Sequence, residues 1–396
     1  MENIELGEQI RRLREKAGVL AKVLADDVGL DASAISNIES GKRSVKTIEL
    51  TNIAKSLGVS PLAILEPESL LARLPIAART TTAEMDEAVH SRLTALAEIH
   101  NVLAAAGISS TKPNIEYPEI HRLDWLSGAR ELAKWAASRC EFDDEHDRFG
   151  ALARTIEDEM GIDVLVEPCE GASALGAAIT DPEFPIIFIN ANQRRARALF
   201  TLAHELGHVL AQDGETLLVD RSLEGTTQQE KFANAFAAEL LMPVDEIASL
   251  IKDFGRSAQT LSRIMLRFQV SFQSMVYRLH NLGFLTTDGR DSFKQMGMGG
   301  LLSEIEDSEE RSALIELGTK YDQWRAPRLL TERLLKGYND GVISIRPLAG
   351  LLNQDPDELM EILSKGSSQE LDIANSLAEN PTHVNSEEER FAGSPN

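Results

Sequence analysis

The chain has 396 residues, which at about 100–200 residues per domain predicts two to four domains. Hydrophobic residues at 43 % and charged residues at 26 % exclude a largely disordered or collagen-like chain. The formal net charge of −23 would repel nucleic acid, but residues 1–60 carry nine basic and nine acidic side chains. That segment is therefore where we expect any contact with nucleic acid.

No stretch of the sequence reads as a membrane anchor or a leader. Apolar runs stay below the ~18 residues that span a bilayer, and the chain starts with the acidic run Met1-Glu2-Asn3-Ile4-Glu5. We therefore expect a cytoplasmic protein without a membrane partner.

Residues 5–66 are predicted to form four or five short helices. Apolar residues recur three and four positions apart, as in Leu6, Ile10 and Leu13. Gly29 separates two of the helices, and Asp31 stands where the side chain of an N-cap residue is needed. The segment is predicted to fold as one compact helical domain.

The next elements are a connector and a mixed domain. Residues 83–106 have helical spacing and end at Gly107, before a Ser/Thr/Pro-rich linker. We interpret this helix as a connector or a dimerising helix. Beyond it, the sequence predicts a helical stretch at 125–160 and three short strands at 163–167, 175–180 and 185–190. Two long helices at 194–212 and 228–241 are predicted to follow.

The C-terminal part is predicted to be helical with a polar end. Further helices run to residue 285, the Gly-rich stretch 286–300 is typical of a linker, and residues 301–364 are helical again. Residues 366–396 are too poor in apolar side chains to pack a core, which predicts a disordered tail.

The strongest chemical signal is the run His204-Glu205-Leu206-Gly207-His208. On a helix, positions i and i+4 share a face, so His204 and His208 can bind one metal ion while Glu205 reaches a water on it. Two cysteines, Cys140 and Cys169, are too few for a four-cysteine site, so a metal must rely on His and carboxylate. This arrangement is typical of a zinc hydrolase.

A catalytic zinc ion needs a third protein ligand, which the following helix can supply. It offers Glu230 and Glu239, and Glu239 stands among apolar residues near the helix end. We therefore choose Glu230. Asn234 lies one turn further along and could hydrogen-bond a ligating histidine, although a polar residue satisfied between packed helices is an equal interpretation.

These residues resemble the ImmA/IrrE family of zinc metallopeptidases. The resemblance rests on His-Glu-Leu-Gly-His at 204–208 and on Glu-x-x-Ala-Asn-x-Phe-Ala-x-x-Leu-Leu-Met-Pro at 230–243, and it covers roughly residues 125–285. It implies a Zn²⁺ site made by His204, His208 and Glu230, with Glu205 as general base and acid. It also implies cleavage of a helix-turn-helix repressor.

Two further features of the site are left open by the residues. Pro185–Asn190 resembles the family's strand beside the cleft and could pair with an extended substrate, whereas an ordinary core strand is the competing interpretation. Tyr277, Arg278 and His280 are the candidates for stabilising an oxyanion, against solvated or structural roles.

The N-terminal segment carries a second resemblance. A recognition helix needs short polar side chains for base edges and cations at its end for phosphates, and residues 32–43 offer both. Residues 5–66 resemble the Xre/Cro-type helix-turn-helix family, most specifically in Ile38-Glu39-Ser40-Gly41-Lys42-Arg43. The resemblance implies an internal ion pair between Arg14 and Glu39. It assigns Ala32, Ser33 and Asn37 to the bases of double-stranded DNA, and Ser40, Lys42 and Arg43 to its backbone.

Together these patterns predict a mainly α protein with a small β-sheet. We expect a transcriptional regulator whose zinc-dependent endopeptidase cleaves a repressor or its own chain; the alternative is a regulator whose peptidase-like domain only senses a ligand or partner. Zero net charge over residues 1–60 predicts weak non-specific binding, so a homodimer is expected to be needed for useful affinity. The predicted parts are a helix-turn-helix DNA-binding domain at 1–66, a helical connector and linker at 67–120, an α+β zincin-like metallopeptidase domain at 121–290, a helical module at 301–365 and a disordered tail at 366–396.

Overall fold

The computed structural model divides the chain into two compact units, Met1–Ala105 and Ala106–Asn396. Within the described residues, no helix is long and apolar enough to cross a membrane. The described residues are 3–57, 61–65, 87–108, 115, 117–120, 123–140, 142, 147–181, 183–211, 217–220, 227–255, 257–321 and 323–365.

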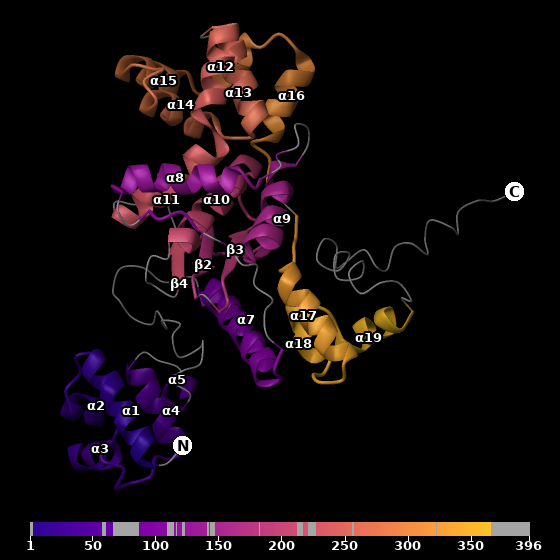
Figure 1. Cartoon of the computed structure of the whole chain (residues 1–396). Coiled ribbons are helices and arrows are strands. Elements are labelled where there is room, and N and C mark those ends of the chain that lie inside the picture. The colour runs from indigo at the N-terminus through magenta and orange to yellow at the C-terminus, as the bar shows by residue number, and fades with distance from the viewer. Residues whose placement is uncertain are drawn as a thin grey trace, which may run out of the picture. The chain divides into compact units, whose positions relative to one another are not determined.

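The first unit is helical, as the sequence predicts (Figure 1). Its core contains Ile10, Leu24, Ile35, Ile38 and Ile53, all without solvent exposure. Its described elements are α1 (Asn3–Lys16), α2 (Ala21–Val28), α3 (Ala32–Glu39), α4 (Thr47–Leu57), α5 (Pro61–Leu65) and α7 (Glu87–Ala105).

Local signals place α2 and α3 at their predicted positions. Gly29 adopts the left-handed conformation with a φ of 72°, and its N–H donates to the Ala25 carbonyl, which ends α2. The Asp31 carboxylate accepts a hydrogen bond of 2.6 Å from the Ala34 N–H and caps α3, as predicted. The connection between the two helices is therefore determined by neighbouring residues.

The connector helix α7 begins four residues later than its prediction, because residues 66–86 lie outside the described part of the chain. Val89, Leu93, Leu96 and Leu103 are buried on this helix, in keeping with their helical spacing. Its role as a dimerising helix stays a prediction, and the linker at 109–114 also lies outside the described residues.

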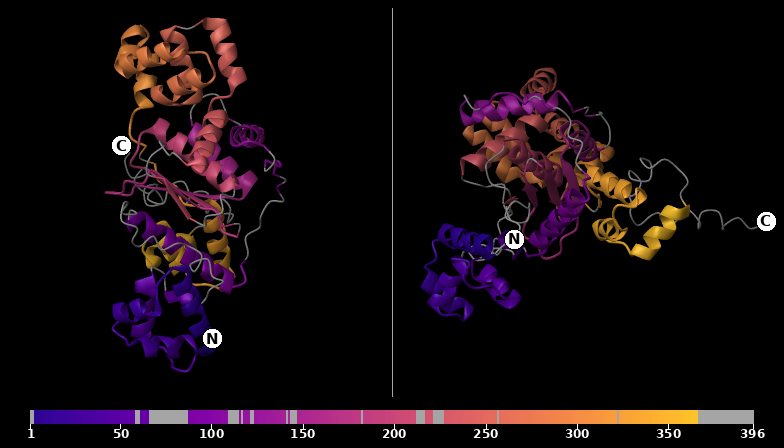
Figure 2. Two further views of the ribbon diagram at one scale, coloured as in Figure 1. Left: turned by 90° about the vertical axis from the view of Figure 1, so that its left-hand side faces the viewer. Right: turned by 60° about the horizontal axis from the view of Figure 1, so that its bottom comes forward.

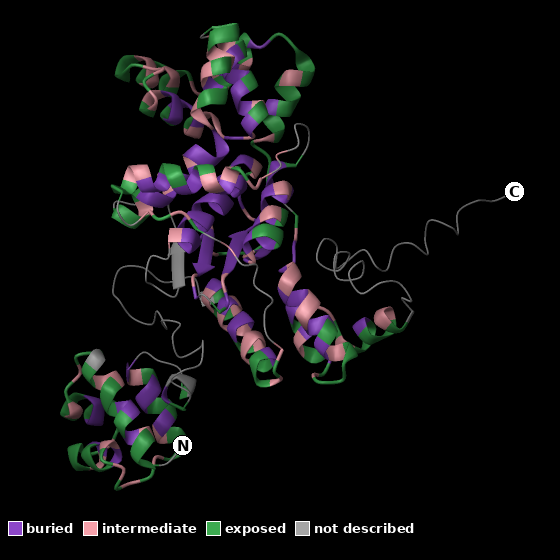
Figure 3. Ribbon diagram, viewed as in Figure 1, coloured by how far each residue is buried: buried purple, intermediate pink, exposed green. Residues whose placement is uncertain are grey.

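The second unit surrounds a small sheet with helices. Figure 3 shows that the buried residues of this unit concentrate in the strands and in the helices that pack on them. Its helices are α8 (Trp125–Ala137), α9 (Arg148–Met160), α10 (Arg195–Ala211), α11 (Gln228–Leu241), α12 (Val244–Phe254), α13 (Ala258–Phe268), α14 (Phe272–Asn281), α15 (Thr287–Glu304), α16 (Ser308–Glu316), α17 (Arg328–Asn339), α18 (Arg346–Leu352) and α19 (Pro356–Lys365).

The sheet has four strands in the order β1-β3-β2-β4. β1 (Asp163–Glu167) is parallel to β3 (Ile186–Asn190), whereas β2 (Gly176–Ile179) is antiparallel to both β3 and β4 (Leu217–Asp220). The first three strands lie within the predicted ranges. β4 is not predicted from the sequence, because four residues in an otherwise acidic and polar segment carry too little periodicity to indicate a strand.

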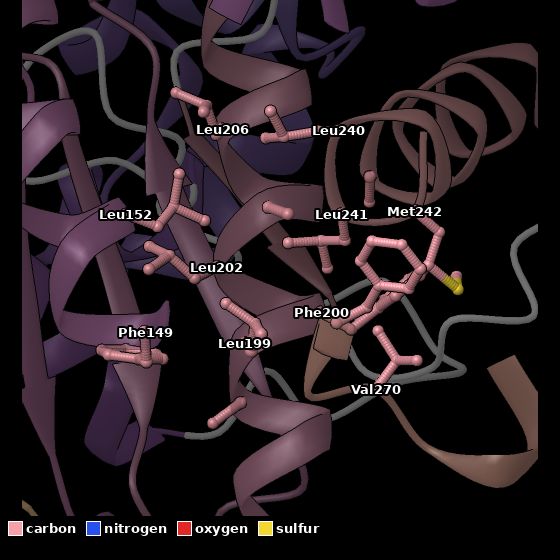
Figure 4. Packing of buried hydrophobic residues seen from close by; sticks show 14 of the residues in the cluster. Phe149, Leu152, Leu199, Phe200, Leu202, Leu206, Leu240, Leu241, Met242 and Val270 are labelled. Atoms are coloured by element: carbon pink, nitrogen blue, oxygen red, sulfur yellow. The ribbon is translucent and has the colours of Figure 1, made fainter. Parts of the chain in front are cut away.

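Helix α10 lies between the sheet and the other helices. It packs on β2 and β3 and also contacts α8, α9 and α11; the left view of Figure 2 shows the strands with the helices of residues 195–241 on one side. In Figure 4, Leu206 of α10 lies near Leu240 of α11, and Phe200 of α10 lies near Leu241. The core is therefore built around the helix that carries both histidines of the motif.

The prediction of a linker at 286–300 is wrong. The Thr286 hydroxyl accepts from the Gly289 N–H and starts α15, and Phe293 and Met298 pack against the main core. Gly297 has a φ of 63° and kinks the helix. Burial of the apolar side chains overrides the low helix propensity of the glycines, which is the physical reason for the error.

Residues on both sides of the predicted domain boundary at residue 301 pack into one hydrophobic core. Leu301, Ile305, Leu314 and Tyr321 belong to the same hydrophobic cluster as the residues of α10. In addition, the N–H groups of Arg195 and Ala196 donate to the carbonyls of Thr319 and Leu317, at 2.9 and 3.2 Å. Residues 317–319 thereby satisfy the start of the histidine-bearing helix. The predicted tail at 366–396 lies outside the described residues.

We expect that a protein ending at residue 300 fails to fold its second unit. Truncation removes the acceptors at the start of α10 and also the pair of hydrogen bonds of 2.9 Å each between Val166 and Arg325. Each buried polar group left without a partner costs about 1–3 kcal/mol. The summed cost for these groups is comparable to the free energy of unfolding of a typical domain. Circular dichroism and zinc content would measure the loss. A protein ending at residue 365 is the control, and a folded 1–300 protein would contradict the prediction.

Candidate metal centre and DNA-binding surface

Helix α10 presents His204 and His208 from successive turns of one face. The two Nε2 atoms lie 3.1 Å apart, and both side chains are fully or almost fully buried. Glu205, the next residue after His204, is also buried. Their positions follow from the helix alone, because residues four apart lie above one another.

Glu230 reaches the same point from the first turn of α11. Its Oε2 lies 3.3 Å from His204 Nε2, and its Oε1 lies 3.5 Å from His208 Nε2. The hydroxyl of Thr227 accepts from the Glu230 N–H at 3.2 Å, so the helix begins where the carboxylate can face α10. Ligand atoms of the three residues all lie within 4.8 Å of one another.

The contact between α10 and α11 depends on Gly207, whose role the sequence analysis missed. A Cβ atom at residue 207 would lie 3.0 Å from Phe236 Cδ1 and 3.2 Å from Ala233 Cα of α11. A side chain there would therefore make a tighter contact than packed atoms normally do, so Phe236 or the backbone of α11 would have to shift by a few tenths of an ångström. A glycine inside an Ala/Leu-rich helix was the signal that could have revealed this close approach.

The donor set suits a divalent transition metal. The pKa of Glu230 is lowered to about 2, because hydrogen bonds from His204 and then from His208 stabilise its carboxylate. Glu230 is therefore an anionic oxygen donor at neutral pH. Two imidazole nitrogens and one carboxylate oxygen form the three-ligand set that catalytic zinc sites use while leaving one position open.

Glu239, the alternative ligand on α11, is engaged elsewhere. Its Oε2 accepts a hydrogen bond of 2.8 Å from Arg278, with both side chains buried. Arg278 also donates to the Met242 carbonyl at the end of α11. This ion pair holds α14 against α11 and explains why the apolar surroundings of Glu239 tolerate a charge.

The three oxyanion candidates have structural contacts in this unit. Arg278 is bound to Glu239, His280 Nδ1 contacts the Leu285 carbonyl at 3.1 Å, and Tyr277 accepts a hydrogen bond from Lys294 at 2.8 Å. Asn234 is half-buried one turn after Glu230 on α11, and its assignment to the metal centre stays a prediction.

The expectation that Pro185–Asn190 could pair with a substrate is wrong. β3 lies in the middle of the sheet, and its backbone pairs with β1 on one side and with β2 on the other. An added strand needs a free edge, so the competing interpretation of an ordinary core strand is correct.

In the first unit, five of the six predicted DNA-contacting residues are exposed, and Arg43 is half-buried. The exposed ones lie on α3 and in the turn that follows it: Ala32, Ser33, Asn37, Ser40 and Lys42. Ser33 and Ser40 use their hydroxyls locally, since Ser33 donates to the Asp31 carboxylate at 2.6 Å and Ser40 donates to the Ser36 carbonyl at 2.8 Å. The exposed surface of α3 is therefore small and polar.

Two arginines support this surface from within. Arg14 forms the predicted ion pair with Glu39, with a closest N···O distance of 2.6 Å, and links α1 to the end of α3. Arg43 is half-buried and donates to Glu49 at 2.7 Å, while Glu49 also accepts from the Lys46 N–H. The structure thus places Arg43 as a brace between the turn and α4, a contact that the sequence analysis missed.

Comparison with known proteins identifies both units. Residues 5–64 match the helix-turn-helix domain family, and residues 157–280 match the IrrE N-terminal-like domain family of peptidases. The chain thus combines a helix-turn-helix DNA-binding domain with an IrrE-like metallopeptidase domain.

The curated relatives are named radiation response metalloprotease IrrE. This chain is 38 % identical to the protein of Deinococcus radiodurans over 104 residues, which is 25 % of this chain and 32 % of that protein. It is also 38 % identical to the protein of Deinococcus deserti over 104 residues, 25 % of this chain and 37 % of that protein. The match therefore spans about a third of the length of each relative.

Proposed function

We propose that this protein is a DNA-binding regulator whose second unit is a zinc-dependent endopeptidase. The observation that carries the proposal is the convergence of His204, His208 and Glu230, from two helices, with the buried Glu205 next to His204 in the chain. A sensing domain that had lost its chemistry would have no need of three metal-binding groups and an adjacent buried acid. The complete set therefore favours proteolysis over the alternative of a purely ligand-sensing regulator.

The residues of the site take distinct roles in the proposed reaction. A zinc ion held by His204, His208 and Glu230 would supply Lewis acidity and lower the pKa of a water towards ~7. Glu205 takes the proton of the water that attacks the scissile carbonyl, and then donates it to the leaving amine. This general acid–base role needs a carboxylate adjacent to the metal ligands, which the i, i+1 position after His204 provides.

We infer that the substrate is a protein, and that a helix-turn-helix repressor is the first candidate. The curated relatives are metalloproteases by name, which supports a peptide substrate for the matched domain. The helix-turn-helix unit of this chain is itself a candidate, since a tether raises the effective concentration of the two units to roughly millimolar. If this chain is the substrate, we expect the cut in the Ser/Thr/Pro-rich linker at 109–114, which lies outside the described residues.

Incubation of the protein with candidate repressors, with added zinc or with a chelator, tests this proposal. We expect a zinc-dependent fragment of a repressor or of this chain in intact-mass measurements, because amide hydrolysis adds water across one bond and splits the mass. The variant Glu205→Gln is the control that should keep every mass intact. Absence of any zinc-dependent fragment across the repressors tested and this chain would favour the sensing alternative.

For DNA binding, we expect different results from Lys42→Ala, Asn37→Ala and Arg43→Ala. Lys42 is exposed, so its loss should weaken binding to all sequences and reduce the salt slope by about one unit. Loss of Asn37 should relax sequence preference, with about 1–3 kcal/mol less discrimination at one base pair. Loss of Arg43 should lower the melting temperature of the first unit, because Glu49 loses its ion-pair partner and keeps only the Lys46 N–H.

Titration of operator and random DNA at several salt concentrations measures these differences. Lys55→Ala, on the last turn of α4, is a matched control for the removal of one positive charge. Equal effects of Lys42→Ala and Lys55→Ala on the salt slope would contradict the assignment of Lys42 to the DNA backbone.

A further inference from the structure

Gly176, the first residue of β2, lies against α10 at the position of Glu205. A Cβ atom at residue 176 would lie 2.7 Å from Thr201 Cγ2, 2.8 Å from Glu205 Oε1 and 3.0 Å from Glu205 Cγ. Carbon atoms of packed side chains normally stay about 3.5–4.0 Å apart. The space that any side chain of residue 176 would need is therefore occupied by Thr201 and by the carboxyl group of Glu205.

The backbone of Gly176 does not itself require glycine. Among the described residues, the glycines with positive φ include Gly29 and Gly161, which end helices, and Gly176 is not one of them. An L-amino acid could adopt its extended conformation in β2 without strain. Only the proximity of α10 excludes a side chain, so the glycine serves the contact with Thr201 and Glu205.

Neither the strand nor the helix can retreat from this contact at low cost. Gly176 stands opposite Ile189 of β3 and Asp220 of β4, so β2 is held by hydrogen bonding on both sides. Helix α10 is tied to the same place, because Thr201 donates to Gln193 Oε1 at 3.0 Å and Gln193 donates to the Leu175 carbonyl at 2.9 Å. The methyl group of Thr201 and the carboxyl group of Glu205 are therefore the parts that must move if residue 176 gains a side chain.

We propose that Gly176 is a positioning residue for Glu205. Its missing side chain leaves the space in which the carboxyl group of Glu205 lies between α10 and β2. This inference rests on the proposed function, in which Glu205 transfers the proton. A displacement of about 1 Å in a catalytic group can lower a rate by about 100-fold, so we expect Gly176→Ala to lower cleavage by that order while zinc stays bound.

A double-mutant cycle on metal-free protein tests the contact without reference to activity. All four proteins carry Thr201→Ser, which removes Cγ2 but keeps the hydroxyl that binds Gln193, so that the three nearest atoms are reduced to the two of Glu205. Residue 176 is glycine or alanine, and residue 205 is glutamate or alanine. We expect Gly176→Ala to lower the melting temperature by about 3–8 °C when Glu205 is present. With Glu205→Ala, the same change should leave the melting temperature unchanged or raise it by about 2 °C.

The control is Gly350→Ala, since a Cβ atom at residue 350 would have no heavy atom within 4 Å apart from its chain neighbours and the backbone of its own helix. It measures what a glycine-to-alanine change does to the melting temperature away from the site. An equal effect of Gly176→Ala in both residue-205 backgrounds would overturn the proposal, because the contact with Glu205 would then carry no energy.

Zinc content and cleavage of the repressor complete the test. The proposal requires about one zinc per chain and reduced cleavage in Gly176→Ala. Zinc bound with undiminished cleavage would overturn it. A failure of the proposed function itself would be seen separately, as unchanged cleavage in Glu205→Gln.

Discussion

Alanine at His204 or at Glu230 is expected to remove most of the zinc from the purified protein, whereas Glu205→Gln should keep about one zinc per chain and abolish cleavage. The difference follows from the geometry. Glu230 approaches both histidines to 3.3 and 3.5 Å, so it would share a metal ion that they bind, while Glu205 is the adjacent acid proposed to transfer the proton. Loss of general acid–base catalysis typically lowers a rate by about 10²–10⁴-fold.

Metal analysis of dialysed proteins and a cleavage assay measure the two effects. Glu246→Gln is the control, because this carboxylate lies on α12 and pairs with Arg267 at 3.3 Å. It should keep both zinc and cleavage. Full zinc occupancy in Glu230→Ala would show that another residue supplies the third ligand.

Glu157→Ala is expected to destabilise the second unit by about 3–5 kcal/mol, which corresponds to a decrease in melting temperature on the order of 10 °C. Glu157 is almost fully buried on α9. Its carboxylate accepts from the side chain of Arg325 and from the N–H groups of Arg328 and Val164, at 3.0 and 3.3 Å for the last two. Alanine would leave the buried guanidinium of Arg325 without its carboxylate.

Thermal unfolding measured by circular dichroism checks this value. Glu15→Ala is the control, because Glu15 forms an exposed i, i+4 pair with Arg11 in the first unit. Such pairs contribute only about 0.3–0.5 kcal/mol. A loss below about 1 kcal/mol for Glu157→Ala would mean that the buried network does not hold α17 to the rest of the unit.

The sequence by itself determined the features that depend on near neighbours. The two histidines on one face of α10 follow from a separation of four residues, and the cap of α3 follows from Asp31 next to its helix. The ranges of β1, α10 and α11 follow from apolar spacing and from their flanking turns. These signals lie within a few residues of the structure they specify.

Tertiary structure decided the features that depend on distant residues. Nothing near Arg43 in the turn shows that it pairs with Glu49, and nothing in 185–190 shows that the strand is central rather than at an edge. The helical state of 287–304 depends on burial against a core made by other segments. Gly176 beside Glu205, and residues 317–319 at the start of α10, are likewise contacts between parts of the chain that are far apart in sequence. Their energy comes from burial and hydrogen bonding between elements, which local propensity does not contain.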